Sequence, residues 1–409
     1  MRFYQKIFQT YWNPYVAISL AGVLSALYFG ATGTVWAVTG EFTRLGGHVL
    51  QWFGVDTSKW AYFNLIKMQG SPLTRTDGWI VIGMLIGALI TVLLSNSFKI
   101  RVPQQKRRLL QGFVGGVIAG FGARLALGCN LAAFFSGVPQ FSFHAWLFML
   151  ATAAGTYIGV KIVMTKWWRG KPNLKPVSQA QLQATPSGKK RSVQPWVGLI
   201  VILVFLAIVI TFTIQGKHLL AVAALAGLGF GILIERGQIC FTSAFRDQWI
   251  SGRAVMTKAI AVGMIVATVC TFFYIHNGIP ALIKPAAPST LLGGLLFGIG
   301  IVMAGGCETG MMYRMMEGQV LYIFVGLGNL VGATLLAFAW DHLGFYNTLV
   351  QGWQPINLLK SWGETVGLLG TLAMLGLWWL SAHWWSRHYK FGRGLQVKSD
   401  AFVARPMKE

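Results

Sequence analysis

The chain has 409 residues, of which 55% are apolar and only 11% are charged, and it contains 27 Phe and 17 Trp. This composition excludes a soluble protein of such length and indicates an integral membrane protein. The formal net charge of +23 would suit a nucleic-acid-binding protein only if the basic residues shared one soluble face. They occur instead in short clusters between apolar runs, so we expect contact with a lipid bilayer and none with nucleic acid.

Ten apolar runs are long enough to cross about 30 Å of hydrocarbon as helices, which takes roughly 20 residues each. They are 16–38, 78–97, 109–128, 144–165, 195–214, 218–234, 254–275, 290–306, 320–340 and 363–386. We therefore predict an all-α polytopic membrane protein with roughly nine to ten transmembrane helices. The chain starts like a signal peptide, but no cleavage site follows, so we expect the first span to be retained.

The basic clusters predict which connections face the cytoplasm. They are Arg2 with Lys6, and the stretches 99–108, 166–176, 188–191 and 387–398. Connections rich in Lys and Arg mark the cytoplasmic side of a membrane, and an even number of crossings puts both termini there. The connections at 39–77, 276–289 and 341–362 carry fewer basic residues and should face outward.

One long polar segment, residues 169–194, is rich in Lys, Gln, Ser and Pro. We interpret it as a basic cytoplasmic linker between a first membrane repeat at 11–168 and a second at 195–388. Residues 389–409 would form a cytoplasmic tail.

An internal repeat links the two units. "GGVIAGFGARLALGC" (115–129) and "GGLLFGIGIVMAGGC" (293–307) agree without a gap at seven of fifteen positions, the final cysteine included. The first copy follows a basic stretch and should run outward, whereas the second follows an outward connection and should run inward. Oppositely directed copies predict an inverted-repeat helical bundle whose small residues allow close helix packing. A weaker echo, 33–42 against 237–246, sets Trp36 or Ala37 opposite Cys240.

Three cysteines stand where a membrane helix is interrupted. Short amphiphilic stretches follow the Gly-Cys pairs at 130–137 and 308–318, and 235–252 resembles them. Interrupted helices of this kind predict broken or re-entrant segments that face a cavity or lie buried in protein. The N–H groups that start such helices suit an anion, and a thiol there can donate a hydrogen bond to it.

We assign the substrate pathway to Cys129, Cys240 and Cys307, because each lies close to Gly and to a polar or charged group. Cys270 has no such neighbours and is interpreted as packing. The glycines would allow close approach to the backbone. The supporting pathway residues are Gly128, Asn130, Gly305, Gly306, Glu308, Thr309 and Arg236.

The charged residues near these cysteines leave several interpretations open. Glu308 and Arg124 are functional candidates because ionisable residues at membrane depth usually are. Glu308 would either cap the short helix it begins or tune the proton of Cys307. Two further pairs would be either structural or functional, namely Glu235 with Arg236 and Arg314 with Glu317.

Metal and nucleotide chemistry receive little support from the sequence. The methionines at 311, 312, 315 and 316 favour adaptable packing over a soft-metal site. The seven His are scattered, and neither a CxxC nor a Walker motif is present. We therefore expect no cofactor and no metal.

The motifs resemble a known family. "ERGQICFTSAFRD" (235–247), "GGLLFGIGIVMAGGCETGMMYRMMEG" (293–318) and "GGVIAGFGARLALGCN" (115–130) are similar to the YeeE/YedE family of bacterial inner-membrane proteins, which import thiosulfate or related sulfur compounds. The likeness covers most of residues 11–341. It implies pathway cysteines at Cys129, Cys240 and Cys307, and an hourglass-like bundle with short helices dipping toward its centre.

The resemblance also implies a partner and a branch. Family members often work with a small TusA-like sulfur carrier in the cytoplasm. The half with Cys129 comes first here, an order that resembles the YedE branch, which is linked to selenium metabolism. We predict a transporter for a small sulfur or selenium anion, with thiosulfate the leading candidate. Two alternatives stay open: a membrane sulfurtransferase or thiol oxidoreductase that uses the same cysteines covalently, and a scaffold that binds a partner through the basic linker.

Overall fold

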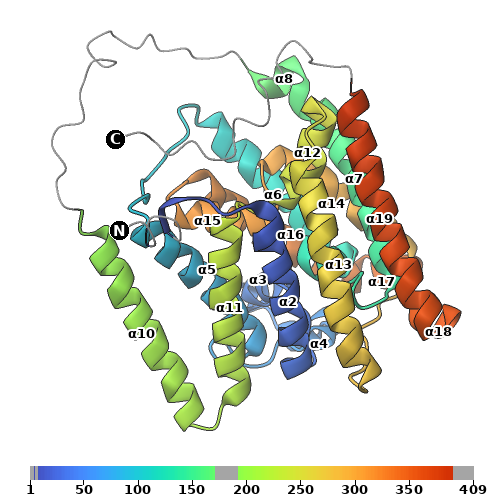
Figure 1. Cartoon of the computed structure of the whole chain (residues 1–409), viewed down its shortest axis with the longest axis horizontal. Helices are drawn as coiled ribbons and strands as arrows, with labels where there is room; N and C mark the ends of the chain where they lie inside the picture. Colours follow the sequence, from blue (N-terminus) through green and yellow to red (C-terminus); the bar gives the residue numbers. More distant parts are fainter. Residues whose placement is uncertain (1–3, 5–7, 171–191, 390–409) are drawn as a thin grey trace.

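A computed structural model of the protein describes residue 4, residues 8–170 and residues 192–389. Over these residues the fold is helical, without any strand, and ten helices are long and apolar enough to cross a membrane (Figure 1). The polytopic all-α prediction is therefore confirmed. Most of the predicted linker 169–194 and tail 389–409, together with Arg2 and Lys6, lies outside the described residues.

Each of the ten long helices overlaps one predicted span. They are α2 (Pro14–Thr32), α5 (Thr76–Leu94), α6 (Arg107–Leu125), α7 (Phe143–Met164), α10 (Gln194–Ile214), α11 (His218–Arg236), α13 (Val255–His276), α14 (Pro288–Ala304), α16 (Leu321–His342) and α19 (Glu364–His388). The first predicted span was too long, because α2 ends at Thr32 and not at residue 38. Gly33 takes a left-handed backbone with φ of 66° and its N–H caps Phe29, which stops the helix.

Shorter helices fill the connections. Three of them directly follow Cys129, Cys240 and Cys307: the π-helical η3 (Asn130–Phe135), α12 (Phe241–Ser251) and α15 (Glu308–Met316). The predicted outward connection 39–77 contains α3 (Thr39–Trp52), η2 (Thr57–Lys59) and α4 (Ala61–Leu65), which the hydropathy pattern did not indicate. The others are α8 (Lys166–Arg169), α17 (Phe345–Leu349) and α18 (Leu358–Trp362).

The two copies of the repeat pack against each other along α6 and α14. A Cβ atom at Gly115 would lie 2.3 Å from the Ala304 nitrogen, and one at Gly293 would lie 2.4 Å from the Ala126 nitrogen. Early residues of one helix thus meet late residues of the other, so the copies run antiparallel. This geometry confirms the inverted repeat and explains its glycines, since only residues without a side chain allow such close helix axes.

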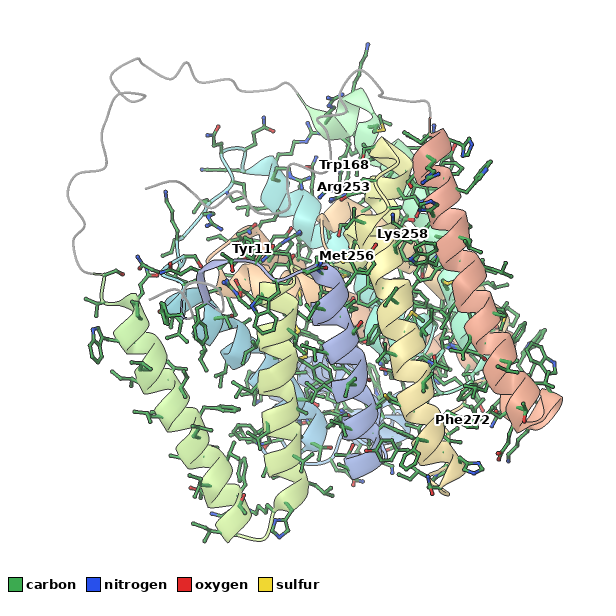
Figure 2. All side chains as sticks on the ribbon, in the orientation of Figure 1. Tyr11, Trp168, Arg253, Met256, Lys258 and Phe272 are labelled. Atoms are coloured by element: carbon green, nitrogen blue, oxygen red, sulfur yellow. The ribbon has the colours of Figure 1, made fainter. Side chains whose placement is uncertain are left out.

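The remaining helices follow the same two-fold pattern. α6 packs against α16 as α14 packs against α7, and α5 packs against α11 as α13 packs against α2. On the periphery, α10 contacts α5 and α11, while α19 contacts α13 and α18. Figure 2 shows the side chains of α10 projecting away from the bundle. Many of these are exposed and apolar, including Trp196, Ile200 and Leu203, which suits contact with lipid.

The weaker echo was set at the wrong residue. α3 begins at Thr39 and α12 begins at Phe241, so Val38 takes the place that Cys240 takes in the second unit. Trp36, one of the two residues that the alignment set opposite Cys240, is instead buried and stacked on Phe230 with ring centroids 3.8 Å apart.

The described parts of the connections predicted to be basic, which include 99–108 and 166–170, lie at one end of the bundle (Figure 1). The stretch that precedes α6 meets the turn between α15 and α16, where the Arg101 N–H donates to the Gly318 carbonyl at 2.8 Å. Trp168 and Arg253 lie near this same end in Figure 2, and Phe272 lies near the opposite one. We call the first the basic end and the second the far end.

Candidate functional site

The backbone breaks in the same way before each of the three cysteines. The residue two positions earlier has a left-handed backbone: Leu127 with φ of 58°, Gln238 with φ of 49° and Gly305 with φ of 84°. The cysteine itself is extended and directly precedes a short helix. In the first copy this left-handed residue is Leu127, and not a glycine. Left-handed residues other than glycine are uncommon and cluster at functional sites.

Cys240 and Cys307 form a thiol pair in the middle of the bundle. Their Sγ atoms are 4.0 Å apart, and both residues are only 1% exposed. Gly310 makes this approach possible, because a Cβ atom there would lie 2.7 Å from the Cys240 sulfur. Segments that are 67 residues apart in the chain thus present their thiols to each other.

Cys129 is fully buried and is also a neighbour of Glu308. Its sulfur lies near the Thr39 hydroxyl group at the start of α3, which has no hydrogen-bond partner among the described residues, and within range of the Glu308 carboxyl group. Glu308 is also a neighbour of the Cys307 thiol. The structure therefore buries all three predicted thiols away from lipid and pairs two of them, while Cys270 is partly exposed on α13.

Buried polar groups without a hydrogen-bond partner surround these thiols. Within the described residues they include both side-chain polar atoms of Asn130, the hydroxyl groups of Thr242 and Thr309, and Oε2 of Glu308. All four residues are at most 2% exposed. Since buried polar groups are normally paired, a concentration of unpaired ones beside three thiols indicates a place for a polar guest. Neutral donors of this kind suit a soft anion.

Glu308 makes one side-chain hydrogen bond, in which Asn329 Nδ2 on α16 donates to its Oε1 at 3.0 Å. The N-cap residue of α15 is Cys307 and not Glu308, which is the first residue of that helix. Thr309, which was also predicted as a supporting residue, follows Glu308 in the chain and is 0% exposed.

The arginines predicted near the site divide into two groups. Arg236 forms the expected ion pair with Glu235, donates to the Phe8 carbonyl and lies over the Tyr11 ring at 5.2 Å. These contacts fasten the start of the chain and do not reach the thiols.

Arg314 forms no ion pair with Glu317, so the second of the two predicted pairs is wrong. Arg314 Nη1 donates to the Gly305 carbonyl at 3.0 Å and to the Tyr322 hydroxyl at 2.7 Å, while Glu317 meets Arg101 at 3.7 Å. The guanidinium group therefore fixes the backbone turn before Cys307 and places a positive charge within range of Cys240. Gly306, in the same turn, faces the Tyr322 ring, where a Cβ atom would lie 2.9 Å from Cε1.

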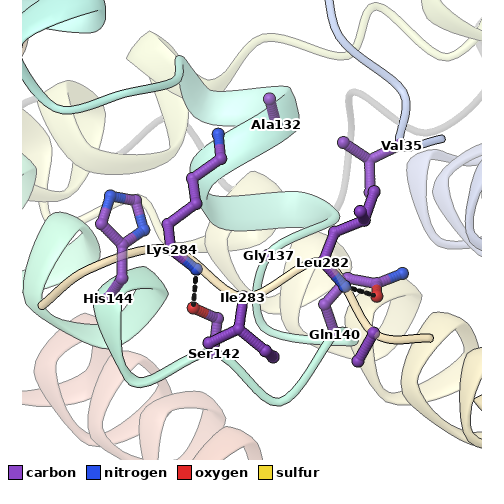
Figure 3. A pocket seen from close by; sticks show the side chains of 10 residues that line it. Val35, Ala132, Gly137, Gln140, Ser142, His144, Leu282, Ile283 and Lys284 are labelled. Carbon is purple, nitrogen blue, oxygen red and sulfur yellow. Dashed lines mark hydrogen bonds between the residues drawn. The ribbon is translucent and has the colours of Figure 1, made fainter. Parts of the chain in front are cut away.

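A pocket of about 310 Å³ opens toward the far end, next to the Cys129 segment (Figure 3). Lys284, Gln140, Ser142 and His144 line it together with Ala132 of η3. The Lys284 ammonium group donates to the Leu127 carbonyl, and a Cβ atom at Gly128 would lie 3.0 Å from its Nζ.

Two cations give the region around this pocket its charge. Burial, and then the charge of Arg124, lower the pKa of Lys284 to about 8. Arg124 is itself 7% exposed, and its Nε donates to the Tyr62 hydroxyl at 2.7 Å. The predicted candidate Arg124 thus lies within range of Lys284.

Four residues of this site escaped the sequence analysis. Lys284 lies in a connection that was set aside as poor in basic residues, and Thr39 begins an unpredicted helix. Asn329 and Gly310 carry no motif of their own, although the Gly in "ETG" offered a signal. Met311 and Met312 are buried in the core, in agreement with packing. Among the described residues, no group of three or more His, Cys, Asp or Glu could hold a metal ion.

Comparisons with known proteins agree with this architecture. The family described as sulphur transport matches residues 1–158 and 236–406. The chain is 50% identical over 366 residues to the probable transporter YedE of Escherichia coli, which covers 89% of this chain and 90% of that protein. It is 38% identical over 98 residues to the thiosulfate transporter TsuA of Escherichia coli, covering 24% of this chain and 28% of the relative. The thiosulfate transporter TsuA of Spirochaeta thermophila is 30% identical over 201 residues, covering 44% and 60% respectively.

Proposed function

This chain belongs to the sulphur-transport (YeeE/YedE) family of multi-pass membrane proteins, and from that premise we propose that it imports a small sulfur- or selenium-containing anion along a pathway lined by Cys129, Cys240 and Cys307. Thiosulfate is the leading candidate, because two relatives are named as thiosulfate transporters. The pathway is non-covalent, so the protein is a transporter and not an enzyme.

One observation carries the proposal: the thiols of Cys240 and Cys307 lie 4.0 Å apart in the buried centre, at the starts of two short helices. Thiols are weak hydrogen-bond donors and soft, polarisable groups. A row of weak donors suits passage, because binding must admit the anion and still release it.

The geometry supports a route from the far end to the basic end. The anion enters the pocket beside Lys284 and passes Cys129 and Thr39. It then meets Cys307 and Cys240, and leaves near Arg314. Supporting residues along this route are Gly128, Asn130, Gly305, Gly306, Glu308 and Thr309, whereas Arg236 contributes by holding the chain near the exit.

The distribution of charge sets the orientation. We place the basic end in the cytoplasm of a bacterial inner membrane, with both termini there, and the far end outside. The repeats 11–168 and 195–388 then meet at the pathway, and the linker 169–194 lies in the cytoplasm. An inside-negative potential opposes anion entry by about 2.3 kcal/mol per charge at 100 mV. Capture inside, for example by a TusA-like sulfur carrier, or coupling to protons must supply the difference.

The test is uptake of radiolabelled thiosulfate by cells that express Cys129→Ala, Cys240→Ala or Cys307→Ala. We expect each to lower uptake at least about tenfold, the loss that removing one favourable contact of 1.4 kcal/mol produces. Cys270→Ala is the matched control and should transport normally. Normal uptake in all three pathway variants would refute the proposal. Selenite and sulfate as competitors then identify the preferred anion.

The covalent alternative deserves one measurement, because a thiol pair at 4.0 Å is close enough to react with little movement. A sulfurtransferase or oxidoreductase would accumulate a persulfide or a mixed disulfide on Cys240 or Cys307. Mass spectrometry of the purified protein after incubation with thiosulfate distinguishes this from transport, which leaves both thiols unmodified.

A further inference from the structure

Glu308 differs from the other deeply buried acids in its surroundings. Four glutamates are at least nine-tenths buried, and three of these have an arginine beside the carboxylate. Glu41 meets Arg75 at 2.5 Å, Glu317 meets Arg101 at 3.7 Å, and Glu235 is paired with Arg236. Glu308 is the fourth, and no lysine, arginine or histidine of the described chain forms an ion pair with it.

The hydrogen bonding of Glu308 suits a neutral acid. Its Oε1 accepts from the neutral amide of Asn329 at 3.0 Å, as the carbonyl oxygen of a carboxylic acid would. Its Oε2 has no partner among the described residues and is the oxygen that would carry the proton. A buried carboxylate without a cation is far more costly than the protonated group.

The groups around Glu308 are polar but mostly uncharged. The thiols of Cys129, Cys240 and Cys307 face it from η3, α12 and its own segment, and α16 adds Asn329. The charged and titratable groups on packed helices have partners elsewhere. These are Arg314 with Tyr322, Glu235 with Arg236, and Asp77 with Arg44. Tyr313 lies under the Arg314 guanidinium group, and its buried hydroxyl group has no hydrogen-bond partner among the described residues.

The repeat makes Glu308 stand out further. The equivalent residue of the first copy, directly after Cys129, is Asn130, whose amide cannot take up a proton. The second copy thus carries an acid where the first carries a neutral analogue. The substitution breaks the symmetry of the pathway at its centre.

We propose that Glu308 is the proton-binding site of this transporter, and that an anion passes the thiols only while the Glu308 carboxyl group carries a proton. The inference rests on the proposed function. The proton arrives from the outer side and sits on Oε2, whose O–H donates to the anion. When the anion has moved toward Arg314, the proton leaves to the inner side. The carboxylate that remains repels an anion at the thiols, which opposes its return. Anion import is thereby coupled to the proton gradient.

The test uses the purified full chain in proteoliposomes and radiolabelled thiosulfate. Initial uptake is measured with an inward proton gradient and again after a protonophore has collapsed it. We expect the gradient to raise uptake by at least about fivefold, the lower limit of typical coupling between two ligands. A pH-sensitive dye trapped inside should report acidification when thiosulfate is added outside.

Glu308→Gln keeps the size and the hydrogen-bond donor but cannot exchange a proton. Whatever its absolute rate, its uptake should be the same with and without the gradient, and thiosulfate should cause no acidification. Glu308→Asp should keep the stimulation. Glu364→Gln changes an exposed glutamate at the start of α19 in the same way, and it should respond to the gradient like the wild type.

Two results would overturn this inference: wild-type uptake that ignores the gradient, or Glu308→Gln uptake that still follows it. The wild-type measurement alone decides the matter if the variants fail to fold. Absence of thiosulfate uptake under every condition would instead refute the proposed function, and the coupling with it.

Discussion

The two cysteine segments of the repeat, 125–135 and 303–316, share a backbone and differ in chemistry. In both, a left-handed residue turns the chain, an extended cysteine follows and a short helix begins. Around Cys129, on the outer segment in the proposed orientation, the neighbouring groups are the Thr39 hydroxyl group and the Lys284 ammonium group. Around Cys307, the inner segment, they are a second thiol on Cys240 and the Arg314 guanidinium group.

This difference teaches that duplication supplied the framework and later substitutions supplied a direction. A lysine at a pocket toward the far end suits capture of an anion from water. A thiol pair at the centre suits weaker binding of the anion by soft hydrogen-bond donors. On the proposed route the anion passes from the charged donor Lys284 to the neutral thiols and then toward Arg314, and the thiols between the two cations bind it only weakly.

The largest effect should come from breaking the crossing that holds both segments. A Cβ atom at Gly122 would lie 2.4 Å from the Phe297 nitrogen, and one at Gly300 would lie 2.3 Å from the Ala119 nitrogen. Both contacts are with rigid backbone, so Gly122→Val and Gly300→Val should each lower the yield of monodisperse protein at least about tenfold.

Size-exclusion chromatography of detergent-extracted protein measures this yield. Gly376→Val on α19 has no atom within 4 Å and is the control that should behave normally. The two contacts are equivalent by the repeat. Unequal yields of the two variants would therefore show that the two halves of the helix crossing contribute unequally to stability.

A smaller effect should follow from making the inner segment resemble the outer one. Cys240→Thr replaces the second thiol by a hydroxyl group, the group that Thr39 offers to Cys129. Thr is well accepted directly before a helix, so the fold should persist. Uptake of thiosulfate should fall about tenfold, the effect of losing one soft contact of about 1.4 kcal/mol. Thr39→Cys, the reverse exchange, should stay active, and wild-type uptake by Cys240→Thr would argue that the pair has no special role.

The smallest effect should come from the charge of the outer segment. Lys284→Gln removes the cation at the pocket without touching the thiols, so KM for thiosulfate should rise about threefold to tenfold while kcat changes little. Lys360→Gln, an exposed lysine on α18, is the matched control.

The same lysine predicts a pH dependence. Burial lowers the pKa of Lys284 to about 8, so the ammonium form that attracts an anion is present below that pH and is lost as pH rises through it. KM of the wild type should therefore rise above about pH 8. Lys284→Arg keeps its charge and should show a flat profile there; a wild-type KM that stays constant from neutral to alkaline pH would contradict the assignment.

Local patterns in the sequence predicted much of this protein, because burial in lipid leaves few choices. Ten long apolar runs had to become helices, since no other isolated segment satisfies its own backbone in hydrocarbon. The glycine spacing before Cys129 and Cys307 revealed the inverted repeat, and the same glycines form the helix crossing. The three cysteines predicted to line the pathway were chosen by nearby glycines and polar groups, and each does precede a short helix.

Only the tertiary structure decided which groups meet. Cys240 faces Cys307 because Gly310 leaves room, and Lys284 reaches Leu127 from a connection that is remote in the chain. Neither contact follows from a pattern within one segment. The predicted pairing of Arg314 with Glu317 was wrong for the same reason. It assumed an ion pair between neighbours along the chain, whereas the Arg314 side chain binds the Tyr322 hydroxyl group and the Gly305 carbonyl group. The sequence by itself determined the crossings and the breaks, which depend on local hydropathy and backbone freedom; the chemistry of the site depends on contacts between segments far apart in the chain.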